Sequence, residues 1–464
     1  MIVLKNEKGA PLYLQIYEQV KDKVISGNIR PESRMPSIRA FSDTLGVSKN
    51  TVTAAYQQLC DEGYLTNRSR SGFYVRELSY PPPVTRDLRP ESTRSADSAP
   101  ESAYDFRYGG IHPGDFPINT WRRLSGRLMS KENLRKMVSY PAPTGEPGLK
   151  QAIGEYLANS RGVSCLPEQI VICSGTQQCL DLVCCMLKKD HTAVAMEDPG
   201  YDGARVVFRN NGFQIVPIPV ESGGIRINEL EKISARLLYV TPSRQFPTGE
   251  IMPIRRRIRL LEWAAHHNAV IIEDDYDSEF RYTGKPIPAI QGIDSRGHVI
   301  YTGTFSRSLS PALRMSYMVI PLNLMETYRM FFRQYHTFVP WTEQAIVETF
   351  IREGHWDRHL RRLRLANKRR HDTLMDAIDR HLGDTVSIIG RDAGLHVLMA
   401  VRSRFSEREL LSRAEQKGVI LGGVERYWIR KDLYTQPAVL VGYSGVNPED
   451  LEKGIHLLKE AWNA

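Results

Sequence analysis

A stretch that cannot form a hydrophobic core divides this chain into two unequal parts. From Arg76 to Ala103 the sequence reads RELSYPPPVTRDLRPESTRSADSAPESA, which is rich in proline, serine and charge and poor in large apolar side chains. Such a segment buries too little apolar surface to offset the entropy of ordering its backbone. We therefore predict three regions: a head over residues 1–76, a flexible linker over 77–103 and a body over 104–464.

The head has the pattern of a helix-turn-helix. Apolar residues recur at every third or fourth position from Leu12 to Val24, which predicts a first helix. Ser37 and Ser48 each stand where a hydroxyl caps the start of a further helix, and Gly46 between those two helices allows a tight turn. We expect the helix after Ser48 to be the recognition helix.

Basic and polar side chains stand where this motif would meet DNA. The segments 64–66 and 73–76 are expected to pair as a hairpin, the wing, around a basic tip at 67–72. The first turn of a recognition helix enters the major groove, where Lys suits guanine, Asn suits adenine and Thr suits a methyl group or a phosphate. The residues expected to contact double-stranded DNA are Arg34, Arg39, Lys49, Asn50, Thr51, Arg70 and Gly72.

The head is also more basic, residue for residue, than the rest of the chain. Residues 1–76 carry 11 Lys and Arg against 7 Asp and Glu, a net charge of +4 out of +9 for the whole chain. The motif resembles the GntR family of winged helix-turn-helix domains, because M-P-S-x-R, L-G-V-S-x-N-T-V, A-Y-x-x-L and E-G-Y-L occur in that order. The resemblance implies an operator-binding head; the pattern alone also fits a protein-binding winged helix.

Short β-like runs alternate with helical stretches in the body. This alternation predicts an α/β fold, with a mostly parallel sheet wrapped by helices. From about Met325 the chain becomes helix-rich and then mixed, which predicts a smaller C-terminal α+β subdomain. The predicted strands are Ile170–Cys173, Ala193–Met196, Leu237–Val240, Ala269–Glu273, Val299–Tyr301 and Tyr317–Ile320.

Polar segments follow four of these strands. They are Ser174–Gln178, Glu197–Tyr201, Thr241–Gly249 and Glu273–Asp277. The carboxyl ends of strands are where open α/β sheets bind ligands, and small residues at a helix start leave backbone N–H groups free for a phosphate. The sequence therefore predicts one ligand site built from all four segments.

Together these segments resemble a fold-type I aminotransferase, and its fusion to a GntR head resembles the MocR regulators. The resemblance implies pyridoxal 5'-phosphate as the ligand and a homodimer of bodies. It implies that Gly175, Thr176, Thr304 and Arg314 hold the phosphate, Tyr201 stacks on the ring, Asp274 pairs with the ring nitrogen and Tyr276 bonds the ring hydroxyl. Gln245 is expected near the cofactor, and Arg426 is a candidate for an effector carboxylate.

One residue departs from that family at the position that carries its chemistry. In G-T-F-S-K the family places the lysine that forms a Schiff base with the cofactor aldehyde, and this chain has Arg307 there. A guanidinium stays protonated and has no free amine to form an imine. We therefore expect no catalytic residue and only noncovalent cofactor binding. Arg244 and Ser316 replace the family's histidine and glycine, and Arg244 with Arg307 is expected to make the site more cationic.

Three functions fit this sequence. The first is a ligand-responsive transcription factor whose effector is pyridoxal phosphate, an amino acid, an amine or an adduct. The second is a working aminotransferase with a DNA-binding appendage, against which Arg307 argues. The third is a DNA-binding protein whose body, with an empty pocket, serves only dimerisation. The chain has no signal peptide, no apolar run long enough to span a membrane and no metal-ligand spacing, so we expect a cytoplasmic protein without a metal site.

Overall fold

The computed structural model describes residues 2–4, 10–78, 104–282 and 287–463. It divides the chain into two compact units, residues 1–98 and 99–464, and each is described by itself below. Most of the segment 77–103 lies outside the described residues, so its assignment as a linker stays a prediction. No helix in the described ranges has both the length and the apolar character needed to cross a bilayer.

The head consists of three helices and a hairpin around one small core. Ser37 Oγ accepts a hydrogen bond from the Ala40 amide at 3.2 Å, and Ser48 Oγ accepts one from the Thr51 amide at 3.2 Å, so both predicted caps are confirmed. Gly46 ends the second helix with φ of 66°, a left-handed conformation that glycine adopts without strain. The elements are α1 (Leu12–Ile25), α2 (Ile38–Leu45), α3 (Lys49–Asp61), β1 (Leu65–Arg68) and β2 (Gly72–Val75).

The wing hairpin is tighter than the sequence predicted. Pairing runs from Leu65 opposite Val75 to Arg68 opposite Gly72, so strand structure extends into the segment expected to be the tip. Arg70 turns the chain with φ of 62°, and Gly72 follows with φ of 106°. These two positive φ values reverse the chain in three residues and leave a short basic tip.

The body is built on one sheet of eight strands that is mostly parallel, as predicted. Three of its strand pairs are antiparallel: β4 with β11, β11 with β10, and β6 with β7. In spatial order the strands are β4 (Ile170–Cys173), β11 (Ser316–Val319), β10 (Val299–Thr304), β9 (Val270–Asp275), β8 (Leu237–Val240), β5 (Ala193–Asp198), β6 (Gln214–Glu221) and β7 (Gly224–Ile225).

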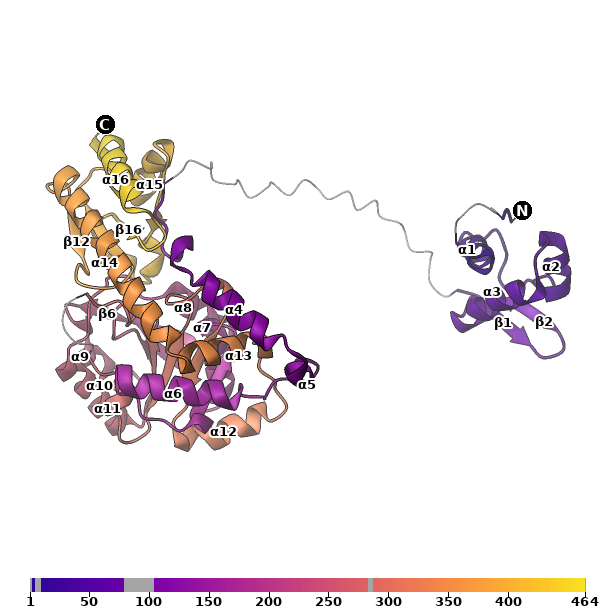
Figure 1. Cartoon of the computed structure of the whole chain (residues 1–464), viewed down its shortest axis with the longest axis horizontal. Coiled ribbons are helices and arrows are strands. Elements are labelled where there is room, and N and C mark those ends of the chain that lie inside the picture. The colour runs from indigo at the N-terminus through magenta and orange to yellow at the C-terminus, as the bar shows by residue number, and fades with distance from the viewer. Residues whose placement is uncertain (1, 5–9, 79–103, 283–286, 464) are drawn as a thin grey trace. The chain divides into compact units, whose positions relative to one another are not determined.

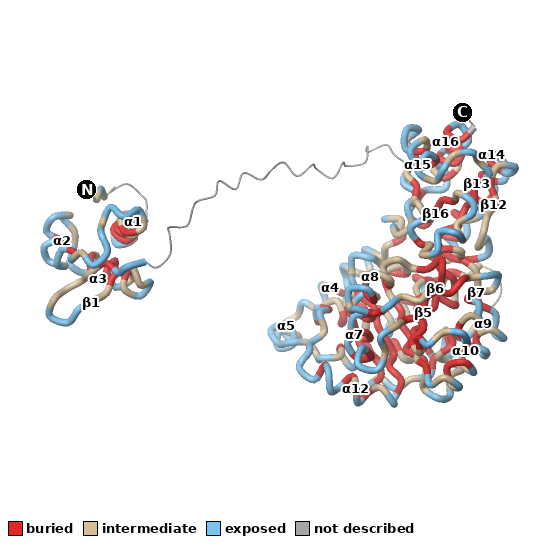
Figure 2. Tube along the Cα trace, turned by 180° about the vertical axis from the view of Figure 1, so that it is seen from behind, coloured by how far each residue is buried: buried red, intermediate tan, exposed pale blue. Residues whose placement is uncertain are grey.

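Helices cover both faces of this sheet because its strands are apolar on both faces. Successive side chains of a strand point to opposite faces, so Ile272 of β9 packs with one set of helices and Ile271 with the other. Figure 2 shows the resulting buried strands at the centre of the body. One face is covered by α7 (Thr176–Leu187), α8 (Asp202–Asn210) and α12 (Leu322–Phe332). The other is covered by α6 (Pro147–Arg161), α9 (Ile227–Leu230), α10 (Ile254–His267), α11 (Ile290–Ile293) and α13 (Trp341–Arg352).

The C-terminal subdomain is a four-stranded sheet backed by helices, as predicted. The long helix α14 (His355–His381) runs from the large subdomain into it (Figure 1). Residues from the start of the body also belong to it, because β3 (Tyr104–Asp105) pairs with β14 (Val419–Ile420). The other elements are β12 (Val386–Ile389), β13 (His396–Val401), α15 (Glu407–Gln416), β15 (Gly422–Gly423), β16 (Ala438–Gly442) and α16 (Pro448–Asn463). The short helices α4 (Ile118–Leu128) and α5 (Leu134–Met137) precede α6.

Candidate functional site

The carboxyl end of β9 directs neighbouring carboxylates to opposite faces of the sheet. Asp274 points to the face covered by α7, where its carboxylate accepts hydrogen bonds from Tyr239 Oη at 2.5 Å and Thr302 Oγ1 at 3.2 Å. Glu273 and Asp275 point to the face covered by α6 and α10. All three side chains are buried. This alternation places one carboxylate at the ligand site and two carboxylates behind it.

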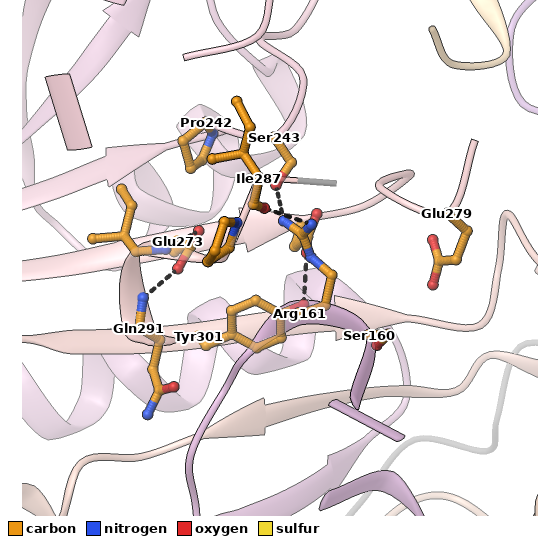
Figure 3. Close-up of polar contacts among 12 residues, drawn as sticks. Ser160, Arg161, Pro242, Ser243, Glu273, Glu279, Ile287, Gln291 and Tyr301 are labelled. Carbon is orange, nitrogen blue, oxygen red and sulfur yellow. Dashed lines mark hydrogen bonds and ion pairs between the residues drawn. The ribbon is translucent and has the colours of Figure 1, made fainter. Parts of the chain in front are cut away.

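Each of the two carboxylates behind the site lies beside a buried arginine, and Figure 3 shows Arg161 and Glu273 in this region. Arg161, at the end of α6, donates from Nε to Asp275 at 2.7 Å and from Nη2 to Ser243 Oγ at 2.6 Å. Burial disfavours the Asp275 carboxylate, but the Arg161 charge and the Tyr301 hydroxyl hold its pKa below the ordinary value. Arg161 thereby ties α6 to the ends of both β9 and β8.

A second buried guanidinium lies beside the carboxylate of Glu273. Arg257 of α10 lies 3.8 Å from the Glu273 carboxylate, which also accepts the amides of Ile290 and Gln291 at 2.8 Å and 2.9 Å. Burial lowers the pKa of Arg257 to about 10. The back of the site is thus a set of hydrogen-bonded charges that hold the strand end in place.

In front of Asp274 the body has a cavity of about 320 Å³. Its lining combines aromatic rings, hydroxyl groups, three guanidinium groups and two carboxylates. The lining residues are Tyr108, Gly175, Thr176, Gln177, Tyr201, Asp202, Tyr239, Thr241, Phe246, Asp274, Tyr276, Thr304, Ser306, Arg307, Pro311, Arg314, Arg426 and Tyr427.

One end of the cavity is suited to an anion. Helix α7 begins there without any side-chain cap, so the N–H groups of its first turn are not bound by its N-cap residue Gly175. A Cβ at Gly175 would lie 2.5 Å from Arg314 Nη2, so only glycine lets that guanidinium reach the helix start. Arg314 also donates to the Ser174 carbonyl at 3.3 Å. Free amides, a positive helix end and a guanidinium together favour a phosphate.

The opposite wall holds polar groups in an otherwise apolar setting. Burial raises the pKa of Asp274 to about 6, although hydrogen bonds from Tyr239 and Thr302 favour its carboxylate. Burial also raises the pKa of Tyr276 well above its ordinary value, so its hydroxyl stays protonated. The hydroxyls of Tyr276 and Tyr108 are buried without a hydrogen-bond partner among the described residues. Such groups are costly unless a ligand or water bonds them.

Arg307 also lies in this cavity. Its Nη1 donates to the Gly109 carbonyl at 2.8 Å, and its Cζ lies 4.3 Å from the ring centroid of Tyr108, a cation–π contact. The side chain is half-buried.

The structure brings together nearly all the residues predicted for the ligand site. Gly175, Thr176, Tyr201, Asp274, Tyr276, Thr304, Arg307, Arg314 and Arg426 all line the cavity.

Two residues expected at or near this site do not line the cavity. Gln245 does not line the cavity: its Nε2 donates to the carbonyls of Pro199 and Phe246 at 2.8 Å and 2.6 Å, so it ties two strand-end loops together. Arg244 does not add charge to the cavity, because it is buried behind the lining and pairs with Asp277 at 3.3 Å.

Several lining residues were not singled out from the sequence. Thr241 and Phe246 stand inside a predicted segment but carried no predicted role. Tyr239 offers one signal, a phenol in the apolar strand LLYV on the same face as Asp274. Nothing in the sequence indicates a role for Tyr108, since its segment lies far from the others in sequence and reaches the cavity only through the tertiary fold.

In the head, the predicted DNA-contacting residues lie in the segment before α2, on α2, at the start of α3 and along the wing. Arg34, Arg39, Lys49, Asn50 and Arg70 are exposed, and Arg39, Lys49 and Asn50 make no side-chain hydrogen bond or ion pair within the described part of the chain. Thr51 Oγ1 lies 2.8 Å from Ser48 Oγ, so it supports the helix cap. A Cβ at Gly72 would lie 3.6 Å from Arg34 Nε, which places the Arg34 side chain beside the wing.

Two family models match this chain. The model for bacterial regulatory proteins of the gntR family matches residues 12–75, and the model for aminotransferase class I and II matches residues 115–445. The fold and site therefore define a GntR helix-turn-helix regulator with a fold-type I aminotransferase body, a class of body whose enzymes depend on pyridoxal phosphate.

Similar proteins carry the same two parts. The uncharacterized HTH-type transcriptional regulator YdeL of Bacillus subtilis is 38% identical over 97% of each chain. The probable rhizopine catabolism regulatory protein MocR of Rhizobium meliloti is 37% identical over 100% of this chain and 96% of its own. This chain belongs to the family of MocR-like HTH-type transcriptional regulators.

A solved structure resembles the body alone. It is LysN, the α-aminoadipate aminotransferase of Thermus thermophilus, complexed with N-(5'-phosphopyridoxyl)-L-leucine. Its sequence identity is 26% and its TM-score 0.68, over 78% of this chain and 92% of LysN.

We predict that Arg161→Met strongly destabilises the body, because it leaves the Asp275 carboxylate buried without its cation. Breaking a buried pair in this way costs about 3–5 kcal/mol. Tryptophan fluorescence during urea unfolding measures this loss in the body alone, since all six tryptophans lie beyond residue 104. The matched control is Arg226→Met, whose pair with Glu221 is exposed and contributes about 1 kcal/mol or less. Equal losses for the two variants would contradict the prediction.

Proposed function

We propose that this chain is a transcriptional regulator whose body binds a pyridoxal phosphate-type ligand without a covalent bond and thereby controls DNA binding by the head. The observation that carries the proposal is the cavity, which joins an anion-binding helix start to a buried carboxylate and an unpartnered phenol. A ligand controls such a regulator only if it binds one arrangement of the protein better than another.

The residues present fit pyridoxal phosphate. The amides at the start of α7, with Arg314 and Thr304, would hold the phosphate, and the unpartnered Tyr276 hydroxyl would donate to the ring hydroxyl. Asp274 would face the ring nitrogen, and a protonated nitrogen there would favour the charged carboxylate over the neutral acid. When bound, this group supplies an aldehyde that condenses with amines.

The chain's own residues argue against the aminotransferase alternative. Transfer of an amino group needs a residue that carries a proton at the cofactor and releases the product, and the guanidinium of Arg307 stays protonated. The relatives YdeL and MocR are named as regulators. We therefore propose that the body does not catalyse transamination.

We predict saturable binding of pyridoxal phosphate to the purified full chain, without the visible absorbance band that a lysine-bound cofactor produces. Arg307→Lys should add that band, because the new amine reaches the same cavity and can be deprotonated when desolvated. An absorbance titration of both proteins measures the effect, and Arg209→Lys on the exposed part of α8 is the control that adds a lysine elsewhere. If the parent chain does not bind and Arg307→Lys gains no band, the body serves only dimerisation.

The head is proposed to bind its operator through the exposed first turn of α3, Arg39 at the start of α2 and the basic wing. Arg39→Ala and Lys49→Ala should each weaken binding to a duplex selected from a random library by about tenfold or more, since each removes a base or phosphate contact. Electrophoretic mobility shifts measure the change, with Arg209→Ala in the body as control. Parental affinity should also fall steeply with added salt. Unchanged affinity in both head variants would contradict this assignment of the DNA-binding face.

We also propose that the body forms a homodimer through an apolar patch on α4, α5, α12 and the loops that follow them. Val138 is 82% exposed and Tyr140 is 86% exposed, and the Tyr140 ring stacks on His336 at 5.2 Å, which joins the two parts of the patch. An exposed apolar patch of this kind is typical of a protein interface. Its members are Ile118, Met129, Leu134, Met137, Val138, Tyr140, Leu322, Met330, Phe331, Tyr335 and Phe338.

The oligomeric state tests this patch. Val138→Asp should convert the dimer to a monomer, because it buries a charge in the interface and touches little of the monomer's own core. Light scattering after gel filtration measures the mass. The control, Ile258→Asp, is on α10, which lies well away from α5 in Figure 1, and it should leave a dimer. A parent chain that is already monomeric would refute the proposal.

A further inference from the structure

The charges that line the cavity are unbalanced. Three guanidinium groups face two carboxylates. Asp202 pairs with Arg426 at 3.4 Å, and Asp274 accepts its hydrogen bonds from hydroxyl groups. Within the described ranges no carboxylate pairs with Arg307 or Arg314. The cavity therefore offers two unpaired cations, which is the charge pattern of a site for a ligand with two anionic groups.

The two unpaired guanidiniums contact different segments of the cavity wall. Arg314 contacts Ser174 and Gly175 at the start of α7. Arg307 contacts Tyr108 and Gly109, from the segment that leads into the body. Because their contacts belong to different segments, one anionic group of a ligand would meet Arg314 and a second would meet Arg307.

Contacts with Gly109 and Tyr108 hold Arg307 in place, but most of its N–H donors have no hydrogen-bond acceptor among the described residues. A guanidinium has five N–H donors, and in the described part of the chain Arg307 uses one of its two Nη groups, on the Gly109 carbonyl. The Tyr108 ring supports its plane at 4.3 Å. A planar donor that is already held in one orientation loses little entropy on binding, and a carboxylate matches its geometry through two parallel hydrogen bonds.

We propose that Arg307 binds the carboxylate of the amino acid part of a phosphopyridoxyl–amino acid, so that the body recognises the cofactor and the amino acid joined as one ligand. This inference rests on the proposed function, since it assigns the second anionic group of the same ligand. Pyridoxal phosphate alone leaves Arg307 without an anion. Pyridoxamine 5'-phosphate brings a cationic amine toward a fixed guanidinium and binds less well for that reason.

Two ligands that differ only in the carboxylate test the assignment. N-(5'-phosphopyridoxyl)-L-alanine carries it, and N-(5'-phosphopyridoxyl)-ethylamine lacks it; both are stable and cannot react with lysines. Calorimetric titration of the full chain should give a dissociation constant on the order of tenfold or more lower for the alanine adduct, the usual effect of a hydrogen-bonded ion pair. Arg307→Gln should remove that preference, so that the two adducts bind the variant with dissociation constants within about threefold of each other.

The remaining outcomes distinguish failure of the role assigned to Arg307 from failure of the proposed function. Arg209→Gln is the matched control and should keep the preference. Equal affinity of the parent chain for the two adducts overturns the role of Arg307 and leaves the proposed function standing; this comparison needs no variant, so it holds even if Arg307→Gln fails to fold. A preference that persists in folded Arg307→Gln also overturns it. Failure of both adducts and of pyridoxal phosphate to bind overturns the proposed function itself.

Discussion

The ion pair between Arg161 and Asp275 is the interaction on which the ligand site depends. It joins α6 to the end of β9 from behind, and the strand's two-residue period then directs Asp274 forward into the cavity. Both partners are buried, so the pair is held by geometry and by the additional hydrogen bonds from Ser243 and Tyr301 rather than by charge alone. Contacts behind the sheet, made by residues that do not line the cavity, therefore orient the residue expected to contact the ligand.

The cavity is lined by nearly all the residues that the resemblance to aminotransferases implies, and Arg307 adds a positive charge to it. At the position where the resemblance implies a lysine, Arg307 carries a permanent cation that contacts Tyr108 and Gly109. A guanidinium has no free amine to form an imine, and it offers a planar set of donors to an anion. In the proposed function, one side chain therefore accounts both for the absence of an imine and for recognition of the ligand.

The head has far fewer residues than the body, and its short helices are stabilised by side-chain caps. Its core is small, and side-chain caps at Ser37 and Ser48 stabilise the two short helices that such a core cannot hold by packing alone. The capping of α3 also leaves Lys49 and Asn50 exposed at its first turn. The Ser48 cap therefore stabilises the head at the same helix start that carries its proposed DNA-contacting side chains.

The sequence by itself determined the features that depend on neighbouring residues: the caps at Ser37 and Ser48, the strands and the polar segments at their ends, and the inability of Arg307 to form an imine. It also indicated that Asp274 and Tyr276 would meet the segment Ser174–Gln178, because the carboxyl ends of the strands lie at one edge of the sheet, and the resemblance to aminotransferases added Arg314. Only the tertiary structure decided that Tyr108 lines the cavity, that Gln245 does not, and that Arg244 pairs with Asp277 behind it. Those outcomes depend on contacts between segments far apart in the chain, where burial and ion pairing determine which way a side chain points.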